Sequence, residues 1–575
     1  LVAVGASALG ANTTGSYNTS VGANSSLGLT EGNNNTSIGD SSLANTTTGS
    51  SNTALGQGSL GSNTTASNST AIGYRAGYSG TTAAGVVAVG YQALYDNTAN
   101  YITGVGYNAL TNNTSGVNNT ALGFGTLNGN TTGGQNTGVG DSVLSANTTQ
   151  SRNTALGYWA ARQSTAAELV AIGYNALGGV NSGSFNTAVG SQSLDANTSG
   201  TQNTALGYGS LTTNTTGSSN TGLGSGALLD NSTGASNTAV GRDALANNTT
   251  GGSNVAFGHQ ALQTSTTASN NVAIGTLAGF YISTGTPNTF VGDRAGYHVN
   301  TGSYNVGVGF RAIYGSSGGA SGANNVAVGN GLLYNLTTGI QNVAIGTYSL
   351  YENTSGNNNI AISGGNYGAG TRGALAYNTT GGSNIAIGFQ SMFSNTTGGT
   401  NIAIGNDALR SNTTASNNTA VGYQAAYSNT TGTNNTSVGF QSLYTNSGGV
   451  ENSSFGRSSL ASNTSGNYNT AIGGRGSDVY AVMNNNTTGG YNVAVGNGSL
   501  ARNTTASENT AVGYQASYSN TTGAYNSSFG NFANYTTTTG VRNTGLGYAA
   551  NFSNNTGSYN TAIGMQALNG NTGSS

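Results

Sequence analysis

The chain has 575 residues, only 5% of them charged, and a formal net charge of −2; it contains 96 glycines, one proline and no cysteine. Charge this sparse provides no basic stripe for a phosphate backbone, so we expect no nucleic acid as a partner. No run of about 20 apolar residues is present to cross a bilayer, so we expect no membrane span in this segment. The absence of cysteine excludes disulfides and thiolate metal sites.

One repeat runs through the whole sequence. A glycine that follows a bulky apolar residue recurs about every 17 residues, from Gly5 and Gly22 to Gly564, and Ser363 replaces it once. The consensus is N-T-A-V-G-Y-Q-A-L-x-x-N-T-T-G-x-x, numbered here as positions one to seventeen. A unit this short cannot bury its apolar face alone, but stacked units can. We predict an all-β, parallel β-solenoid of 33 coils, a single continuous shaft over 1–575. Leu1 is not an initiator methionine, so we expect a segment of a longer protein.

Positions two to four of each coil are predicted to form a strand. Position two is Thr, Val or Ile in all coils except at Ser453 and Ser527, and position four is always large and apolar. Such residues favour strands, and alternate strand residues share a face. We therefore expect positions two and four to point inward, against the leucine that is common at position nine. Where position nine is small, as at Gly296, an aromatic residue such as Tyr297 follows and is expected to fill the core.

Position three is then expected to face outward. It is Ala, Gly or Ser in every coil except at Phe290. Solvent does not require small residues, whereas close approach of a second chain does. We expect this row to be buried between copies of the chain in a parallel homotrimer, with Phe290 filling a widened gap. The subunit-packing residues expected from this argument are Ala3, Ala54, Ala121, Ala239, Phe290, Ala403, Ala511 and Ala562.

Asparagine is predicted at two corners of the coil. At position one it is replaced by aliphatic residues such as Leu1, Val86 and Leu169, which indicates a buried corner where the amides bond turn backbone and one another. A second Asn, followed by Thr-Thr-Gly, predicts another turn, with glycine supplying a positive φ. These turns are also Asn-x-Ser/Thr sequons. The candidate glycosylation sites are Asn12, Asn63, Asn147 and Asn412.

Three repeats are longer than the rest. Their extra residues, 314–324, 364–378 and 474–486, lie between intact core motifs, and we expect surface loops. The second and third loops concentrate aromatic and charged residues in a chain that has few of them. The candidate ligand contacts are Tyr367, Arg372, Tyr377, Arg475, Asp478 and Tyr480.

Catalysis is not expected. An active site needs converging titratable groups, whereas His259 and His298, the two histidines, fall in separate coils and neither has an acidic partner in a recurring register. We expect no enzyme, no cofactor and no metal. Tyrosines recur at position six, as at Tyr74 and Tyr423, and are expected to lie outside, partly stacked.

The segments N-V-A-V-G-N-G-S-L (Asn492 to Leu500) and N-I-A-I-G-N-D-A-L (Asn401 to Leu409) resemble the head repeat of YadA-like trimeric autotransporter adhesins. The array is also similar to phage-type tail-fibre repeats. The resemblance implies a left-handed parallel β-roll in a homotrimer. The family's repeat is shorter, so the second turn is longer here. A single-chain left-handed β-helix is the alternative fold.

These patterns favour a non-enzymatic, extracellular fibre shaft at a cell surface or on a virion. Its expected partners are other copies of itself and a surface glycan or host-surface receptor. The alternative function is an ice-binding solenoid, which requires outward threonines in register on a flat face. Because threonine at position two exchanges with Val and Ile, we expect it inside, which disfavours ice binding.

Overall fold

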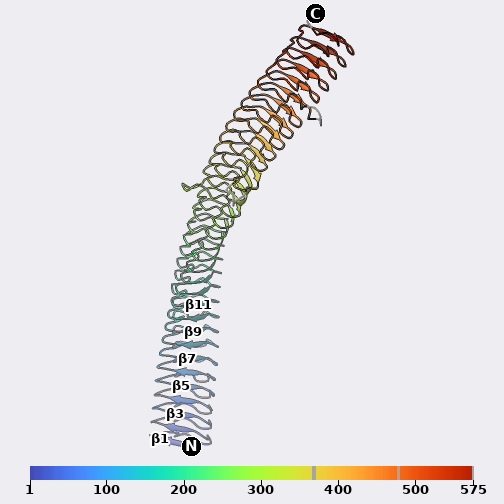
Figure 1. The fold of residues 1–575 in the computed structure, drawn as a ribbon. Coiled ribbons are helices and arrows are strands. Elements are labelled where there is room, and N and C mark those ends of the chain that lie inside the picture. Colours follow the sequence, from blue (N-terminus) through green and yellow to red (C-terminus); the bar gives the residue numbers. More distant parts are fainter. Residues whose placement is uncertain (366–370, 476–479, 573–575) are drawn as a thin grey trace. The chain divides into compact units, whose positions relative to one another are not determined.

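The computed structural model describes residues 1–365, 371–475 and 480–572. They form a parallel β-solenoid of about 33 coils, each with one short strand (Figure 1). The chain divides into two compact units, unit 1 (Leu1–Leu277) and unit 2 (Ala278–Ser575). The described residues contain no helix, and so none that is long and apolar enough to span a membrane.

Unit 1 contains strands β1 to β17. They are β1 (Val2–Val4), β2 (Thr19–Val21), β3 (Thr36–Ile38), β4 (Thr53–Leu55), β5 (Thr70–Ile72), β6 (Val87–Val89), β7 (Thr103–Val105), β8 (Thr120–Leu122), β9 (Thr137–Val139), β10 (Thr154–Leu156), β11 (Val170–Ile172), β12 (Thr187–Val189), β13 (Thr204–Leu206), β14 (Thr221–Leu223), β15 (Thr238–Val240), β16 (Val255–Phe257) and β17 (Val272–Ile274).

Unit 2 contains strands β18 to β33. They are β18 (Thr289–Val291), β19 (Val306–Val308), β20 (Val326–Asn330), β21 (Val343–Thr347), β22 (Ile360–Ser363), β23 (Ile385–Ile387), β24 (Ile402–Ile404), β25 (Thr419–Val421), β26 (Thr436–Val438), β27 (Ser453–Phe455), β28 (Thr470–Ile472), β29 (Val493–Val495), β30 (Thr510–Val512), β31 (Ser527–Phe529), β32 (Thr544–Leu546) and β33 (Thr561–Ile563).

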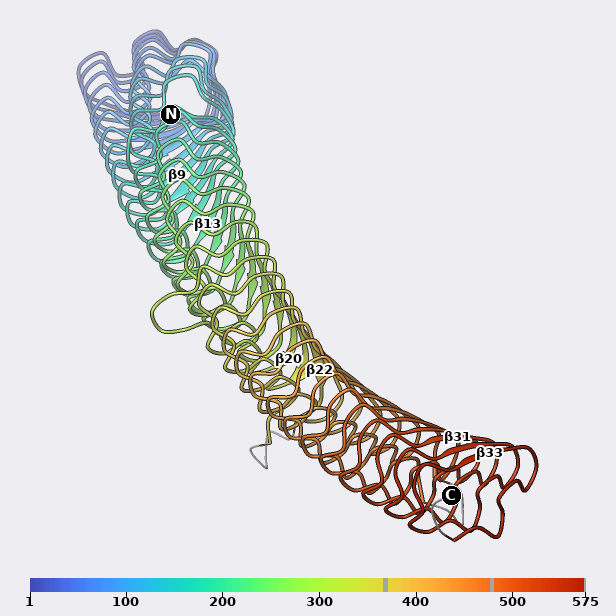
Figure 2. The same ribbon diagram turned by 90° about the horizontal axis from the view of Figure 1, so that it is seen from above.

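Within each unit, equivalent positions of successive coils lie side by side. Strand β13 pairs in parallel with β14, so that Thr204 lies beside Thr221 and Leu206 beside Leu223. The same pairing crosses each of the three longer repeats, joining β19 to β20, β22 to β23 and β28 to β29. Figure 2 shows from above how the coils of each unit lie over one another. The extra residues therefore leave the sheet unbroken.

The two faces of the strand are opposite to those expected from the sequence. At position three, Ala205 and Ala403 are fully buried. Their neighbours at positions two and four point the other way: Thr204 is exposed, and Ile404 is 38% exposed. The middle residue therefore faces the interior, and the β-branched and aliphatic residues on either side of it form the outer surface.

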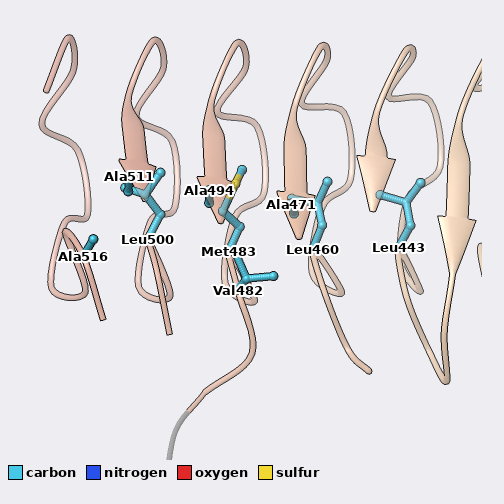
Figure 3. Close-up of a cluster of buried hydrophobic side chains, with 9 residues drawn as sticks. All are labelled: Leu443, Leu460, Ala471, Val482, Met483, Ala494, Leu500, Ala511 and Ala516. Carbon is cyan, nitrogen blue, oxygen red and sulfur yellow. The ribbon is translucent and has the colours of Figure 1, made fainter. Parts of the chain in front are cut away.

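Position three is small because the leucine of the preceding coil lies against it. Figure 3 shows this pairing in unit 2, where Leu460 lies beside Ala471 and Leu500 beside Ala511. In unit 1, a Cβ atom added to Gly104 would lie 2.8 Å from Cγ of Leu94. A second chain is therefore not needed to explain the small residues. The residues expected at a subunit interface are instead buried in their own chain, apart from Ala3 in the first coil: they are Ala54, Ala121, Ala239, Phe290, Ala403, Ala511 and Ala562.

Phe290 fills a space left by a missing leucine. Its side chain is fully buried, and position nine of its own coil is Gly296. A Cβ atom on Gly296 would lie 2.4 Å from Cδ2 of Phe290, and one on Gly307 would lie 3.0 Å from Cδ1. Tyr297, expected to turn inward here, instead stacks in a column with Tyr314, with ring centroids 5.3 Å apart. Core volume is conserved, but by position three rather than position ten.

Glycine follows position four in every coil except that of Ser363, because the backbone there leaves little space for a side chain. Gly207 has φ +136°, and a Cβ atom on it would lie 2.5 Å from the carbonyl oxygen of Gly224 in the next coil. At other turns of the coil, residues other than glycine adopt left-handed backbone conformations. Gln192, Leu194 and Gln202, at positions seven, nine and seventeen, have φ values of 58°, 51° and 59°. Such conformations cost about 1–2 kcal/mol each for non-glycine residues, so the stack must hold them in place.

The asparagines of position one form a buried ladder, which is interrupted where another residue takes the position, as at Val86 and Leu169. Nδ2 of Asn237 donates a hydrogen bond to the carbonyl oxygen of Gly251 (2.8 Å), and its Oδ1 accepts one from the backbone N–H of Asn254 (3.0 Å). Gly251 lies at the second turn of the same coil, and Asn254 opens the next coil. The expected buried corner is therefore confirmed, and each amide satisfies backbone groups that would otherwise be buried without partners.

The asparagines of position twelve form a second ladder. Nδ2 of Asn231 donates to the carbonyl oxygen of Gly234 in the same turn (3.0 Å) and to Oδ1 of Asn214 in the preceding coil (2.8 Å). The expectation of a positive φ at the glycine of this turn is wrong. Gly234 has no such φ, and Ser236, two residues later, takes φ 59°. A Cβ atom on Gly234 would lie 2.3 Å from the next coil's backbone, so glycine is needed here for close approach.

The corrected orientation predicts different outcomes for one substitution at two sites of the same coil. Leu409→Asp buries a carboxylate at a fully buried position, which costs several kcal/mol. Ile404→Asp places the carboxylate at the outer face and should cost about 1 kcal/mol or less. Amide hydrogen exchange over residues 401–425 should increase strongly for Leu409→Asp only. Equal increases for both variants would contradict the orientation described here.

The ladder of position one predicts that a larger apolar residue is tolerated better than a smaller one. Asn237→Ala removes four side-chain hydrogen bonds and opens a cavity, leaving the N–H of Asn254 and the carbonyl of Gly251 without this partner, at about 1–3 kcal/mol for each group. Asn237→Leu loses the same bonds but fills the space, as Leu169 does in unit 1. Hydrogen exchange and thermal melting should rank the wild type first, Leu second and Ala last. If Ala matches the wild type, the amide ladder does not hold the coils together.

Candidate functional site

The outer face of the strands is an uncharged surface. Positions two and four carry no Asp, Glu, Lys or Arg in any coil. In unit 1, threonine occupies position two in three runs of four successive strands, β2–β5, β7–β10 and β12–β15. In unit 2, strands β19–β24 carry Val or Ile at both positions instead. The outer face is thus a regular array of methyl groups, with hydroxyls concentrated in unit 1.

The expected tyrosine row of position six lies outside and is stacked. The ring centroids of Tyr74 and Tyr91, Tyr91 and Tyr107, and Tyr107 and Phe124 are 5.2, 4.9 and 5.2 Å apart, with nearly parallel planes. A stacked ring turns its edge to solvent, because its faces are covered by its neighbours. A ligand that binds aromatic faces therefore finds few of them along this column, whose evident role is to join coils.

Two residues of the second long loop belong to one compact cluster. The Arg372 guanidinium donates to the Glu352 carboxylate (Nη1 to Oε1, 2.8 Å) and lies over the rings of Tyr351 and Tyr377, 4.4 and 4.7 Å from their centroids. The positive charge is paired and both its faces are in use. Tyr367, the remaining candidate of this loop, lies outside the described residues. The cluster fixes the end of the loop to the coil beneath it.

The third long loop contributes to a small cavity. Arg475 and Tyr480 line a space of about 120 Å³ with Ser458, Ala481 and Asn484. Asp478, the other candidate of this loop, lies outside the described residues. The structure therefore brings together Arg372 with Tyr377, and Arg475 with Tyr480.

The candidate glycosylation sites are unsuitable in the folded chain. Nδ2 of Asn147 and of Asn412, the atom that would carry a glycan, donates to Oδ1 of Asn130 (2.8 Å) and of Asn395 (2.7 Å). Asn63 is likewise buried, and Asn12 donates to the carbonyl oxygen of Gly15 (3.1 Å). These sequons serve the second ladder, and a glycan on their Nδ2 atoms would replace hydrogen bonds of that ladder.

Burial shifts the pKa values of a carboxyl group in unit 1 and of a group of contacting rings in unit 2, Tyr297, His298 and Tyr314. Burial raises the pKa of Asp195, which accepts a hydrogen bond from Nδ2 of Asn175 (2.6 Å). Burial also lowers the pKa of His298, whose ring stacks on Tyr281 with centroids 5.2 Å apart. Asp195 belongs to unit 1 and His298 to unit 2. Over 1–365, 371–475 and 480–572, no group of three or more His, Cys, Asp or Glu residues could hold a metal ion.

One pocket in unit 2 was not predicted from the sequence. It has a volume of about 410 Å³. It is lined by Phe532, Tyr548, Ala549, Phe552, Ser553, Gln566 and Asn569. The sequence of the repeat does contain a signal for this pocket. Position seven is mostly Gln, Asn, Ser or Gly, but in two successive coils it is Phe532 and then Ala549. A large residue followed by a small one in a stacked row creates a hollow.

No protein-family model and no curated protein sequence matches this chain.

Proposed function

We propose that the chain is a non-enzymatic, extracellular structural shaft that gives length to a fibre. The observation that supports this is the uniform connection between coils. The same two amide ladders and the same strand pairing recur along both units, whatever residues the outer face carries. Length can then be set by the number of coils, without any single coil being essential.

The resemblance to YadA-like heads and tail-fibre arrays supports an adhesin-like or tail-fibre-like shaft at a cell surface or on a virion. By the same resemblance, we propose a left-handed roll that associates with other copies of itself, as a trimer. Because position three is inside, the surface offered to those copies is the outer face of positions two and four. There, Ile345 and Ile404 remain 37% and 38% exposed. A surface glycan or host-surface receptor is the proposed external partner.

A shaft should lose length without losing its fold when whole coils are removed. Deleting residues 186–270 removes five complete coils and joins equivalent positions. Unit 1 should shorten by about 24 Å, given about 4.8 Å for each strand spacing. Small-angle X-ray scattering and resistance to proteolysis measure these outcomes. Deleting only residues 186–193 displaces the register and should destroy protease resistance. Loss of folding in the five-coil deletion would contradict the proposal.

Ice binding is a second candidate, favoured by the corrected orientation of position two. Thr187, Thr204, Thr221 and Thr238 lie in register on the outer face of four successive strands. A flat, uncharged array of hydroxyl and methyl groups about 4.8 Å apart can hold ordered water against the sheet. The inward threonine that counted against this function is therefore not observed.

Charge placed on the threonine face should abolish any ice binding. The double variant Thr204→Lys/Thr221→Lys puts two ammonium groups in the middle of the run, where they would disrupt an ordered water layer. Thr216→Lys, in an exposed turn of the same region, is the matched control. Thermal hysteresis should be present in the wild type and the control and lost in the double variant. Wild-type protein without thermal hysteresis would eliminate this candidate.

A further inference from the structure

We propose that the pocket around Ala549 in unit 2 binds an uncharged saccharide. The inference stands on the geometry of the pocket, and it gives a location to the surface glycan named above as a proposed partner. The pocket arises where the repeat departs from its consensus at position seven in consecutive coils.

The hollow is made by one missing side chain. Ala549 lies in a row with Phe532 before it and Gln566 after it, in successive coils. The N–H of Ala549 donates to Asn531, which precedes Phe532, and the N–H of Gln566 donates to Tyr548, which precedes Ala549 (2.9 and 2.8 Å). Because Ala549 has only a methyl group, a gap one coil high opens between the Phe532 ring and the Gln566 amide.

Two of the three aromatic rings of the pocket, Tyr548 and Phe532, lie outside the stacked columns, whereas Phe552 stacks on Tyr535 with ring centroids 5.0 Å apart. Tyr548 has Asn531 and Met565 as its neighbours at position six, which carry no ring, and it is 50% exposed. The Phe532 ring stands at 87° to the Tyr548 ring, with centroids 6.0 Å apart. It also stands at 65° to the Phe552 ring, 6.3 Å away. These rings are therefore not covered face to face by one another, in contrast to the column of Tyr74 and Tyr91.

The chemistry of the lining fits a sugar better than other ligands. Its polar groups are the amides of Gln566 and Asn569, the Ser553 hydroxyl and the Tyr548 phenol, and none of its residues is an acid or a base. An anionic ligand would find no cation there, and a cationic one no carboxylate. A saccharide combines C–H surfaces, which pack on rings, with hydroxyls that both donate to and accept from amides. The volume of about 410 Å³ lies in the range of about 300–1,000 Å³ usual for small-ligand sites.

The test is saturation-transfer NMR on the complete chain with cellobiose and lactose as neutral probes and 3′-sialyllactose as an anionic one. Ala549→Gln should reduce binding at least tenfold by filling the hollow. It should fold normally, because glutamine occupies position seven elsewhere, as at Gln424 and Gln515. Tyr548→Ala should weaken binding similarly. Tyr423→Ala, in the same row outside the pocket, is the control and should bind as the wild type does.

Binding of a neutral disaccharide that is lost in Ala549→Gln and retained in Tyr423→Ala supports the proposal. It is overturned if neither neutral probe binds at millimolar concentration, if Ala549→Gln binds as the wild type does, or if only the anionic probe binds. The five-coil deletion of unit 1 leaves the pocket intact. Failure of the saccharide site and failure of the shaft are therefore separate results.

Discussion

The buried amide is the constraint on which the rest of the coil depends. A 17-residue coil encloses little apolar volume, so its turns bring backbone N–H and carbonyl groups into the interior without a helix or a second sheet to satisfy them. An asparagine side chain offers both a donor and an acceptor, and the same residue in the next coil offers them again at the same place. The need to satisfy every buried polar group thereby enforces strict repetition.

The narrow interior also determines which residue faces inward. Opposite the leucine of position nine there is room for little more than a methyl group, so alanine points in and the bulkier Thr, Val and Ile point out. The usual rule that large apolar residues are buried fails here, because it assumes a core wide enough to hold them. Non-glycine residues in the left-handed region, such as Leu194, follow from the same tight path.

Much of this fold could be predicted from the sequence, and the part that could not has a definite cause. The period, the strand at positions two to four and the asparagine corner all follow from residue types compared across coils. The orientation of the strand does not, because Thr exchanging with Val suits a pocket and a surface equally well. Covariation between positions within a coil would have decided which face of the strand points inward. Phe290 occurs with Gly296, and Ser20 occurs with Ser25, whose hydroxyls lie 2.8 Å apart inside the coil.

The candidate sites can likewise be divided into those that the sequence indicates and one that it does not. Sequence composition drew attention to the long loops, where the described charges and rings mainly secure the loop to the stack, as Arg372 does. The pocket at Ala549 arises in a coil of ordinary length and depends on three residues about 17 apart in sequence. In a repeating chain, a site is better sought along one row of successive coils than within one stretch of sequence.

Near-identical coils create a difficulty during folding, because a coil can add to the growing stack one repeat out of step and still form almost every bond. The buried Phe290 opposes such slippage. Its ring lies against Gly307 in the next coil, where a Cβ atom would be 3.0 Å from Cδ1, so a coil added one repeat out of step would bring Ala327 against the ring instead. The serine pairs and the longer repeats act in the same way. These irregularities specify the register of the coils, so that a chain of near-identical repeats reaches one native arrangement.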